Sequence, residues 1–359
     1  MKTKILKAIS LLLVMILVAT ISVGCGSGNT PGNTPNNSPN TSEGSSSNGE
    51  AEYNFVIGHG SSERSVNHYV AQRAAELMEQ KSNGRIKTTI YPNASLGKTR
   101  ELIEGTIDGT IDLFPYVSNG FVEFVNACAI FDMASLSPSI EVMRQVLDDP
   151  EIIAALEPEF EKAGLKFFGF SDAGYRQLTA NRPINSLEDF KGLKVRVMEN
   201  KNQIAYWEAL GANPTPMDYS EVYISLQQGT IDAQENPLDL IVDAKFYEVQ
   251  KYLVKTSHIP FSLIMPMNLE KFNSLPADLQ QVVTESLIQA NKDTREWADN
   301  IMKDYEKTLA ENGVETIILP DEVYAQMKER AETSYNLIRE QVGDELVDKM
   351  LTTVEKYSK

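Results

Sequence analysis

From Tyr53 onward, segments with strand patterns alternate with segments of helical periodicity, and this alternation restricts the fold more than any other feature. Apolar residues at every second position indicate strands at 53–57 and 86–90. Between them, apolar residues recur at spacings of three and four from Val66 to Met78, which predicts an amphipathic helix. A strand, a helix and a second strand in this order form a βαβ unit, so we expect parallel strands covered by helices.

The same alternation continues to the C-terminus. The tetrapeptide Gly-Thr-Ile-Asp occurs three times, at 105–108, 109–112 and 229–232, and two of these copies follow a predicted helix. The recurrence marks either the same joint in two similarly built lobes or a reused helix-stop sequence. Further strands are expected at 111–114, 166–170, 194–198, 261–267 and 314–319, and helices at 99–107, from Pro237 to about Leu253, from Pro276 to Asn312, and after 319.

The charge balance and the cysteine content exclude several classes of function. The 359 residues carry 33 basic and 50 acidic side chains, a formal charge of −17. A field of that sign repels phosphate backbones, so nucleic-acid binding is not expected. Two cysteines cannot form a disulfide framework, and no CxxC pair or Cys/His cluster offers a metal site. We therefore predict no metal site and no cofactor, and interpret Cys128 as a small core residue.

The N-terminus has the pattern of an export signal. Lys2, Lys4 and Lys7 precede an uncharged run over residues 8–23. As a helix, this run would span about 24 Å, less than the ~30 Å hydrocarbon core of a bilayer. A cleaved signal peptide fits this pattern better than a membrane anchor, and we assign it to residues 1–24.

The segment that follows predicts attachment through a lipid. Residues 21–25 resemble the bacterial lipoprotein lipobox, in which the cysteine, here Cys25, is lipidated and becomes the first residue. Ser22 stands where that motif usually has Leu, Val or Ile, and the alternative is ordinary secretion with an incidental cysteine. Gly, Ser, Asn, Thr and Pro dominate the next residues, so we predict a flexible tether over 25–52.

Two arginines stand in or beside predicted strands. In the strand over 194–198, valines face one side and Arg196 faces the other. On an exposed sheet face this arginine would be solvated, whereas in a sheet buried on both faces it would need an anionic partner. Arg176, which follows Gly174 and Tyr175, is open to the same two interpretations.

Five linked segments resemble the solute-binding proteins of tripartite ATP-independent periplasmic (TRAP) transporters. The likeness covers residues 53–359 and is most specific over 174–258. It implies an α/β chain with a two-lobed fold of the periplasmic-binding-protein type (type II-like), in which mixed sheets are flanked by helices and a long helix bridges the lobes. The segments are Gly174 to Ile184, Leu187 to Val197, Leu210 to Met217, Ser220 to Tyr223 and Asp232 to Pro237.

The resemblance also implies a ligand site without catalytic residues. In the family, the arginine of the Lys-x-Arg-Val strand forks the ligand carboxylate, and here that residue is Arg196. The arginine of the Gly-x-Arg motif assists and corresponds to Arg176. The asparagine of Gln-Glu-Asn-Pro, here Asn236, contacts the carboxylate, and the aromatic residue after Pro-x-Pro-Met, here Tyr219, lines the pocket. From its position after the first strand, His59 is a candidate for facing the ligand from the other lobe.

The domain organisation and the role follow from the same resemblance. Lobe I is expected over 53–174 with about 259–290, and lobe II over 175–258 with about 291–359. The implied protein captures a small organic acid through its carboxylate in the cleft and delivers it to a TRAP permease. We expect it outside the cytoplasm, held to the outer face of the cell membrane by its lipid alone.

The ligand and two other roles stay open at this stage. Monocarboxylates, dicarboxylates, sugar acids and keto acids all suit an arginine fork. Sialic-acid-binding relatives carry a glutamate near the position of Tyr116 and Val117, and its absence here argues against sialic acid. The alternatives are a ligand sensor that presents a bound carboxylate to a receptor, or a surface-tethered hydrolase with a carboxylate pair. The hydrolase is disfavoured because HExxH, GxSxG and P-loop motifs are missing.

Overall fold

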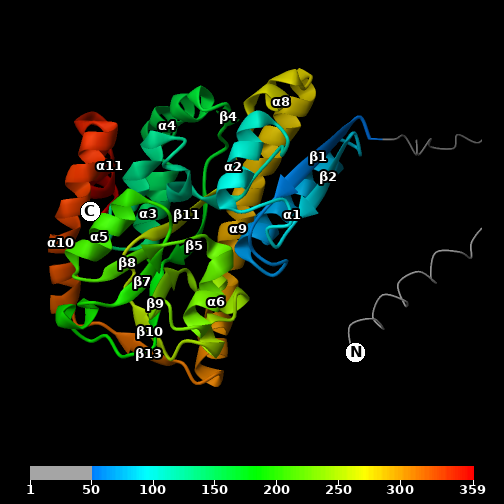
Figure 1. Cartoon of the computed structure of the whole chain (residues 1–359). Helices are drawn as coiled ribbons and strands as arrows, with labels where there is room; N and C mark the ends of the chain where they lie inside the picture. Colours follow the sequence, from blue (N-terminus) through cyan, green and yellow to red (C-terminus); the bar gives the residue numbers. More distant parts are fainter. Residues whose placement is uncertain (1–50) are drawn as a thin grey trace, which may run out of the picture. The chain divides into compact units, whose positions relative to one another are not determined.

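The structure is a computed structural model that describes residues 51–359. The predicted signal peptide (1–24), the lipidation site Cys25 and nearly all of the predicted tether lie outside the described residues. Within the described part, no helix combines the length and the apolar character needed to cross a membrane. Helices flank several small sheets, and the long helix α9 (Ala277–Glu311) runs beside both β5 (Ser171–Tyr175) and α1 (Val66–Lys81) (Figure 1).

The predicted N-terminal βαβ unit is confirmed. Strand β1 (Tyr53–Gly58) pairs in parallel with β2 (Ile86–Tyr91), and α1 connects them. The side chain of Ser65 accepts a hydrogen bond from the His68 N–H and so caps the N-terminus of α1. This arrangement places the loop after β1 and the first turn of α1 at the same edge of the sheet.

The principal sheet has six strands of mixed direction. In the order β13-β10-β6-β9-β7-β8, the pairs β7/β8, β7/β9 and β10/β13 are parallel, and β6 is antiparallel to β9 and β10. Register places Gln177 opposite Asn236 and Arg196 opposite Gln234. Segments that are distant in sequence therefore meet here: β6 (Gln177–Ala180), β7 (Lys194–Val197), β8 (Asn213–Pro216), β9 (Ala233–Asn236), β10 (Tyr252–Lys255) and β13 (Glu315–Ile318).

Three predicted strands differ in the structure. The strand expected at 166–170 is interrupted, because Gly169 adopts a left-handed φ of +84°, and it becomes β4 (Leu165–Lys166) followed by β5. The strand expected at 111–114 is reduced to isolated bridges of Leu113 with Ile57 and Met267. The strand expected at 261–267 is divided into β11 (Pro260–Ile264), which pairs with β5 and β3 (Tyr116–Val117), and β12 (Met267–Asn268), which pairs with β4.

The helix expected from Pro237 to about Leu253 is wrong beyond its first turns. Helix α7 ends at Asp243, and Lys245 follows with a left-handed φ of 54°. Leu253 belongs instead to β10, where it lies opposite Thr179. The other helices are α2 (Thr99–Asp108), α3 (Ile140–Leu147), α4 (Pro150–Lys162), α5 (Lys201–Ala209), α6 (Val222–Gln227), α7 (Leu238–Asp243), α8 (Leu269–Ser274), α10 (Asp321–Val342) and α11 (Asp344–Tyr357), with short 3₁₀ turns at Ser118–Phe121, Asn126–Asp132, Leu187–Phe190, Tyr219–Glu221 and Phe246–Glu248.

The described part of the chain contains several apolar cores. One is built from residues 102–170 together with α11, which packs on α3 and α4. Cys128 is completely buried there, so its prediction as a core residue is confirmed, and burial raises the pKa of its thiol well above the ordinary value. Another core covers the principal sheet and includes Phe190 and Trp207. The exact lobe boundaries stay a prediction.

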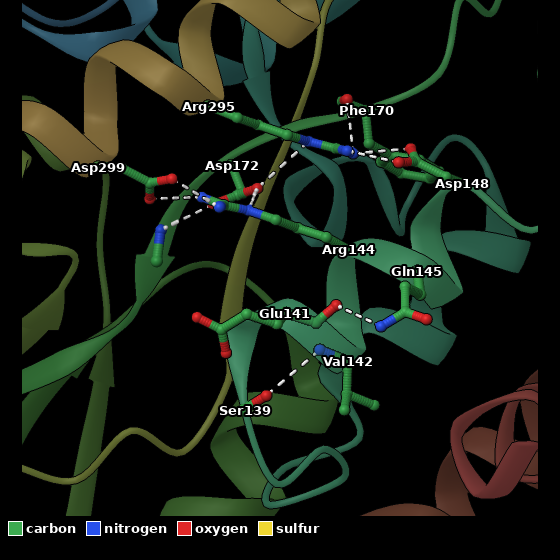
Figure 2. Close-up of polar contacts among 11 residues, drawn as sticks. Ser139, Glu141, Val142, Arg144, Gln145, Asp148, Phe170, Asp172, Arg295 and Asp299 are labelled. Carbon is green, nitrogen blue, oxygen red and sulfur yellow. Dashed lines mark hydrogen bonds and ion pairs between the residues drawn. The ribbon is translucent and has the colours of Figure 1, made fainter. Parts of the chain in front are cut away.

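A network of ion pairs attaches α9 to the strand that leads toward Arg176 (Figure 2). Asp172 of β5 is fully buried and accepts two hydrogen bonds of 2.8 Å from Arg144 of α3. The same guanidinium reaches Asp299 of α9 at 2.7 Å, and Arg295 of α9 lies 3.3 Å from Asp172. Because the buried carboxylate joins three elements, we expect it to contribute far more to stability than the exposed Asp299.

Asp172→Asn tests this expectation, with Asp299→Asn as its matched control on the same arginine. Loss of the buried negative charge leaves two largely buried guanidinium groups without their shared partner, and we expect the free energy of unfolding to fall by about 3 kcal/mol. The control Asp299→Asn removes a half-exposed partner of Arg144, so we expect the free energy of unfolding to fall by less than about 1 kcal/mol. Urea unfolding followed by circular dichroism at pH 7 measures both, and equal losses would contradict a special role for Asp172.

Candidate ligand-binding site

A small cavity lies between the N-terminal βαβ unit and the principal sheet. We call its two walls the N-terminal side, built by the β1–α1 segment and β3, and the sheet side, built by the ends of β6, β7 and β9. Ser61 and Asn67 belong to the first wall. Four of the predicted site residues belong to the second, namely Arg176, Arg196, Tyr219 and Asn236. The fold thus brings together residues as distant in the sequence as Ser61 and Asn236.

Arg196 is a buried cation that forms no ion pair with a carboxylate of residues 51–359. Its neighbours Val195 and Val197 point into the core, so the alternation of β7 directs Arg196 to the opposite face. The side chain is 2% exposed, and its Nε and Nη2 donate to the carbonyl of Met217 at 3.0 and 2.7 Å. No carboxylate among residues 51–359 lies within 4.0 Å of its nitrogens, and burial lowers its pKa. A buried guanidinium of this kind can bind an external anion.

Arg176, in contrast, already has a protein partner. Its guanidinium forms a bidentate ion pair with Glu235, and its Nη2 also donates to the Glu235 carbonyl at 2.6 Å and to Asn236 Oδ1 at 3.1 Å. The ring of His258 lies 3.1 Å from Glu235 and is held by Thr256 at 2.9 Å. Burial alone would raise the pKa of Glu235, but Arg176 and His258 outweigh it and hold it at about 2. Arg176 is therefore positioned rigidly, with its charge balanced.

Sequence reasoning did not identify Glu235 as the partner of Arg176. A signal was present, since an acidic side chain inside a buried strand must be paired, and Glu235 stands in the Gln-Glu-Asn-Pro motif. What the sequence could not supply was the antiparallel register of β6 and β9, which brings Arg176 alongside Glu235.

Asn236 and Tyr219 lie on the cavity wall with their polar atoms already engaged. The Asn236 amide accepts from Arg176 and donates to Gln234 Oε1 at 2.6 Å. Tyr219 donates its hydroxyl to the Leu240 carbonyl at 3.2 Å, and its ring packs edge-on against Phe246. Both side chains are therefore fixed by neighbours within their own wall.

His59 lies beside the cavity but does not contribute to its wall. Its ring is fully buried, and Nε2 is 3.0 Å from Nδ1 of His68. Burial lowers the pKa of His59 to about 3, which keeps the ring neutral. The wall is formed instead by the next residues, Gly60 and Ser61, and by Asn67. Asn67 was missed in the sequence, although a polar residue beside the apolar stripe of a helix is a visible signal.

Acidic side chains of the sheet side cap helices of the N-terminal side. Asp239 accepts a hydrogen bond of 2.9 Å from the first N–H of α1, that of Val66. Asp218 accepts one of 3.2 Å from the first N–H of α2, that of Thr99. Burial raises the pKa of Asp239 to about 7, whereas hydrogen bonds from Ser220 and Thr99 outweigh burial and lower the pKa of Asp218. Both contacts join the two walls around the cavity.

Glu235→Gln and Arg196→Met test the different roles of the two arginines in ligand-free protein. We expect Glu235→Gln to lower the free energy of unfolding by about 3–5 kcal/mol, because it leaves Arg176 as an uncompensated buried cation. We expect Arg196→Met to change it by less than about 1 kcal/mol, because the lost bonds to Met217 are offset by removal of a buried unpaired charge.

The pH dependence checks the assignment to Glu235. Its pKa of about 2 lies below the ordinary 4.5, so its contribution to stability is complete above pH 4.5 and is lost as the pH falls toward 2. The difference in unfolding free energy between parent and Glu235→Gln should therefore narrow below pH 4.5. A difference that stays constant down to pH 2 would contradict the ion pair.

Comparisons with known proteins identify relatives over most of the chain. Residues 57–341 match the DctP family, described as bacterial extracellular solute-binding protein, family 7. The 2,3-diketo-L-gulonate-binding periplasmic protein YiaO of Escherichia coli K12 is 32% identical over 73% of this chain and 80% of its own length. The sialic acid-binding periplasmic protein SiaP of Vibrio cholerae is 32% identical over 66% of this chain and 75% of its own.

Solved structures show the same fold. The sugar acid binding protein of Advenella mimigardefordensis in complex with galactonate superposes with a TM-score of 0.81 at 27% identity, over 85% of this chain and 98% of that one. A TRAP periplasmic solute-binding protein from Desulfovibrio salexigens with bound orotic acid gives 0.81 at 28% identity, over 85% and 99%. The two-lobed α/β fold with mixed sheets and a long helix is thereby confirmed.

Proposed function

This chain belongs to the DctP family of bacterial extracellular solute-binding proteins, and we propose that it binds a small organic acid by its carboxylate at Arg196 and delivers it to a TRAP permease. The observation that carries the proposal is the buried Arg196 guanidinium, which faces a cavity and has no anionic partner among the described residues. The relatives named above carry ligands or names that denote carboxylic acids, which supports the same chemistry. The family consists of binding proteins, and we propose no catalytic step.

The geometry supports different roles for the two arginines of the site. Arg196 supplies the charge and a planar fork of donors that matches a carboxylate. Arg176, held by Glu235, offers its face and its remaining donor edge without adding net charge to the cavity. Asn236 and Tyr219 complete this wall. Charge-assisted hydrogen bonds contribute roughly 1.5–3 kcal/mol each, so a few of them hold a small acid once water is excluded.

We propose that ligand binding closes the two walls of the cavity. The contacts of Asp239 with Val66 and of Asp218 with Thr99 join the walls without involving the ligand carboxylate. They would form when the walls approach each other, and the closed form would then be the one that the permease recognises. This assignment extends the family's role to particular residues of this chain.

Thermal unfolding with a panel of small carboxylates tests the binding proposal. A ligand at 100 times its Kd adds about 2.7 kcal/mol to the free energy of unfolding and raises the Tm by several degrees. Arg196→Met should abolish this shift. The matched control Arg196→Lys keeps the positive charge but loses the planar fork, and we expect at least about tenfold weaker binding. An unchanged shift in Arg196→Met would remove Arg196 from the site.

We also propose that Cys25 carries a lipid that holds the mature protein at the outer face of the membrane. The lipobox-like sequence before Cys25 and the Ser/Asn/Pro-rich segment after it support this proposal. In cells that export the chain, Cys25→Ser should move the protein from the membrane fraction to the soluble extracytoplasmic fraction, as measured by fractionation and immunoblotting. Retention of Cys25→Ser in the membrane fraction would contradict the lipid anchor.

A further inference from the structure

Asn67 lines the cavity and has a buried polar atom without a partner among the described residues. The residue is 1% exposed and lies in the first turn of α1, on the wall opposite Arg196. Its Nδ2 donates to Ser61 Oγ at 2.9 Å, whereas its Oδ1 has no hydrogen-bond partner among residues 51–359. A buried acceptor without a donor is unfavourable, so a bound molecule that donates a hydrogen bond at this point is favoured.

The hydroxyl group of Ser61 adds a hydrogen-bond donor beside the Asn67 acceptor. It is 3% exposed, lines the same cavity, and uses its oxygen to accept from Asn67. Its own hydroxyl proton is then left to donate to another acceptor. Asn67 Oδ1 and the Ser61 hydroxyl thus offer one acceptor and one donor side by side. A ligand hydroxyl satisfies both, and it does so for either orientation of the Asn67 amide because a hydroxyl donates and accepts.

The charges around the cavity leave room for only one carboxylate. Arg176 is neutralised by Glu235, which leaves Arg196 as the unmatched cation on the wall. Asp218 lines the same cavity; burial raises its pKa, but hydrogen bonds from Ser220 and Thr99 outweigh this and lower it, so the group is ionised at neutral pH. A second carboxylate on the ligand would meet this negative charge.

The neighbouring cations do not change this balance. Lys98 pairs with Glu221 at 2.8 Å, and Arg100, in an adjoining pocket, pairs with Glu104 at 2.9 Å. All four side chains are at least half exposed, so solvent screens them. The wall between Arg196 and Asn67 includes apolar side chains, which suit the carbon skeleton of a ligand: Val117, Leu240 and Phe261.

Resting on the carboxylate-binding function proposed above, we propose that the ligand is a hydroxylated monocarboxylic acid. Its carboxylate binds Arg196, and a hydroxyl group distant from it binds Asn67 and Ser61. Unsubstituted fatty acids leave Asn67 Oδ1 unsatisfied. Simple keto acids offer only an acceptor there, and dicarboxylates bring a second negative charge toward Asp218. Asn67 and Ser61 are therefore the residues that determine specificity in this cavity.

Titration calorimetry of the purified protein with acids of matched length tests the proposal. The four-carbon set is D-erythronate, L-threonate, butyrate, 2-oxobutyrate and succinate, and the six-carbon set is D-gluconate, D-galactonate, hexanoate and adipate. We expect at least one hydroxylated monocarboxylate to bind about 100-fold more tightly than every acid of the same length without hydroxyl groups, because buried polar groups reject analogues that leave them unpaired.

Asn67→Leu tests the residue itself, with Ser61→Ala as a milder second variant. Asn67→Leu should weaken the binding of the best hydroxylated acid by about 10–100-fold, which is the value of one or two buried hydrogen bonds. The affinity for the matched fatty acid should change by less than about threefold. Ser61→Ala should produce a smaller loss with the same selectivity. The Tm of each variant without ligand reports whether it folds, and the panel on the unmodified protein decides the question if Asn67→Leu does not.

The outcomes separate this inference from the proposed function. If succinate, adipate or a fatty acid binds as tightly as the hydroxylated acid of its length, the hydroxyl site is wrong while carboxylate binding stands. If Asn67→Leu weakens both classes of acid equally, Asn67 is structural and its assignment to specificity is overturned. If no acid in the panel binds folded, ligand-free protein, the carboxylate function itself is contradicted, and the hydroxyl site with it.

Discussion

The site depends on one unusual constraint, a guanidinium group that is removed from water and has no ion-pair partner in the part of the chain that the structure describes. Arg196 keeps its place because the alternation of β7 fixes its direction and the Met217 carbonyl accepts from two of its nitrogens. Two hydrogen bonds to one neutral oxygen do not replace the hydration of a full charge. A carboxylate bound at Arg196, as proposed above, would therefore lower the electrostatic free energy of the site. In this proposal, the buried unpaired guanidinium lowers the stability of the ligand-free protein and strengthens the binding of a carboxylate.

Arg176, the second arginine that lines the cavity, avoids that cost. Arg176 is satisfied by Glu235, which His258 also contacts, and all three side chains are buried. An arginine paired in this way destabilises the fold little and has little freedom to move. Arg176 therefore contributes to the shape of the cavity more than to its net charge. One cation balanced internally and one left open give the cavity a single strong anchor. In our proposal, the polar atoms of the opposite wall would discriminate among the acids that Arg196 binds.

The features predicted correctly from sequence are those set by local pattern. The βαβ unit from Tyr53 to Tyr91 and the long helix α9 follow from uninterrupted periodicity, and the direction of the Arg196 side chain follows from strand alternation. The failures required knowledge of distant partners. Leu253 has apolar neighbours compatible with a helix, yet it pairs with Thr179 in β10 because the sheet needs a strand there. The partnership of Arg176 with Glu235 and the unpaired Asn67 Oδ1 likewise exist only after β6, β9 and α1 have been placed in space.

The complete burial of Cys128 has a practical consequence for observing this molecule at work. Within residues 51–359 it is the single cysteine, and its thiol is both inaccessible and held in the unreactive protonated form. A cysteine introduced at any exposed position of this region would be the one thiol there that a maleimide dye can reach while the protein is folded. A fluorophore on each wall, attached through two such cysteines, would report the distance between the walls in single molecules, with every native side chain of the core left in place.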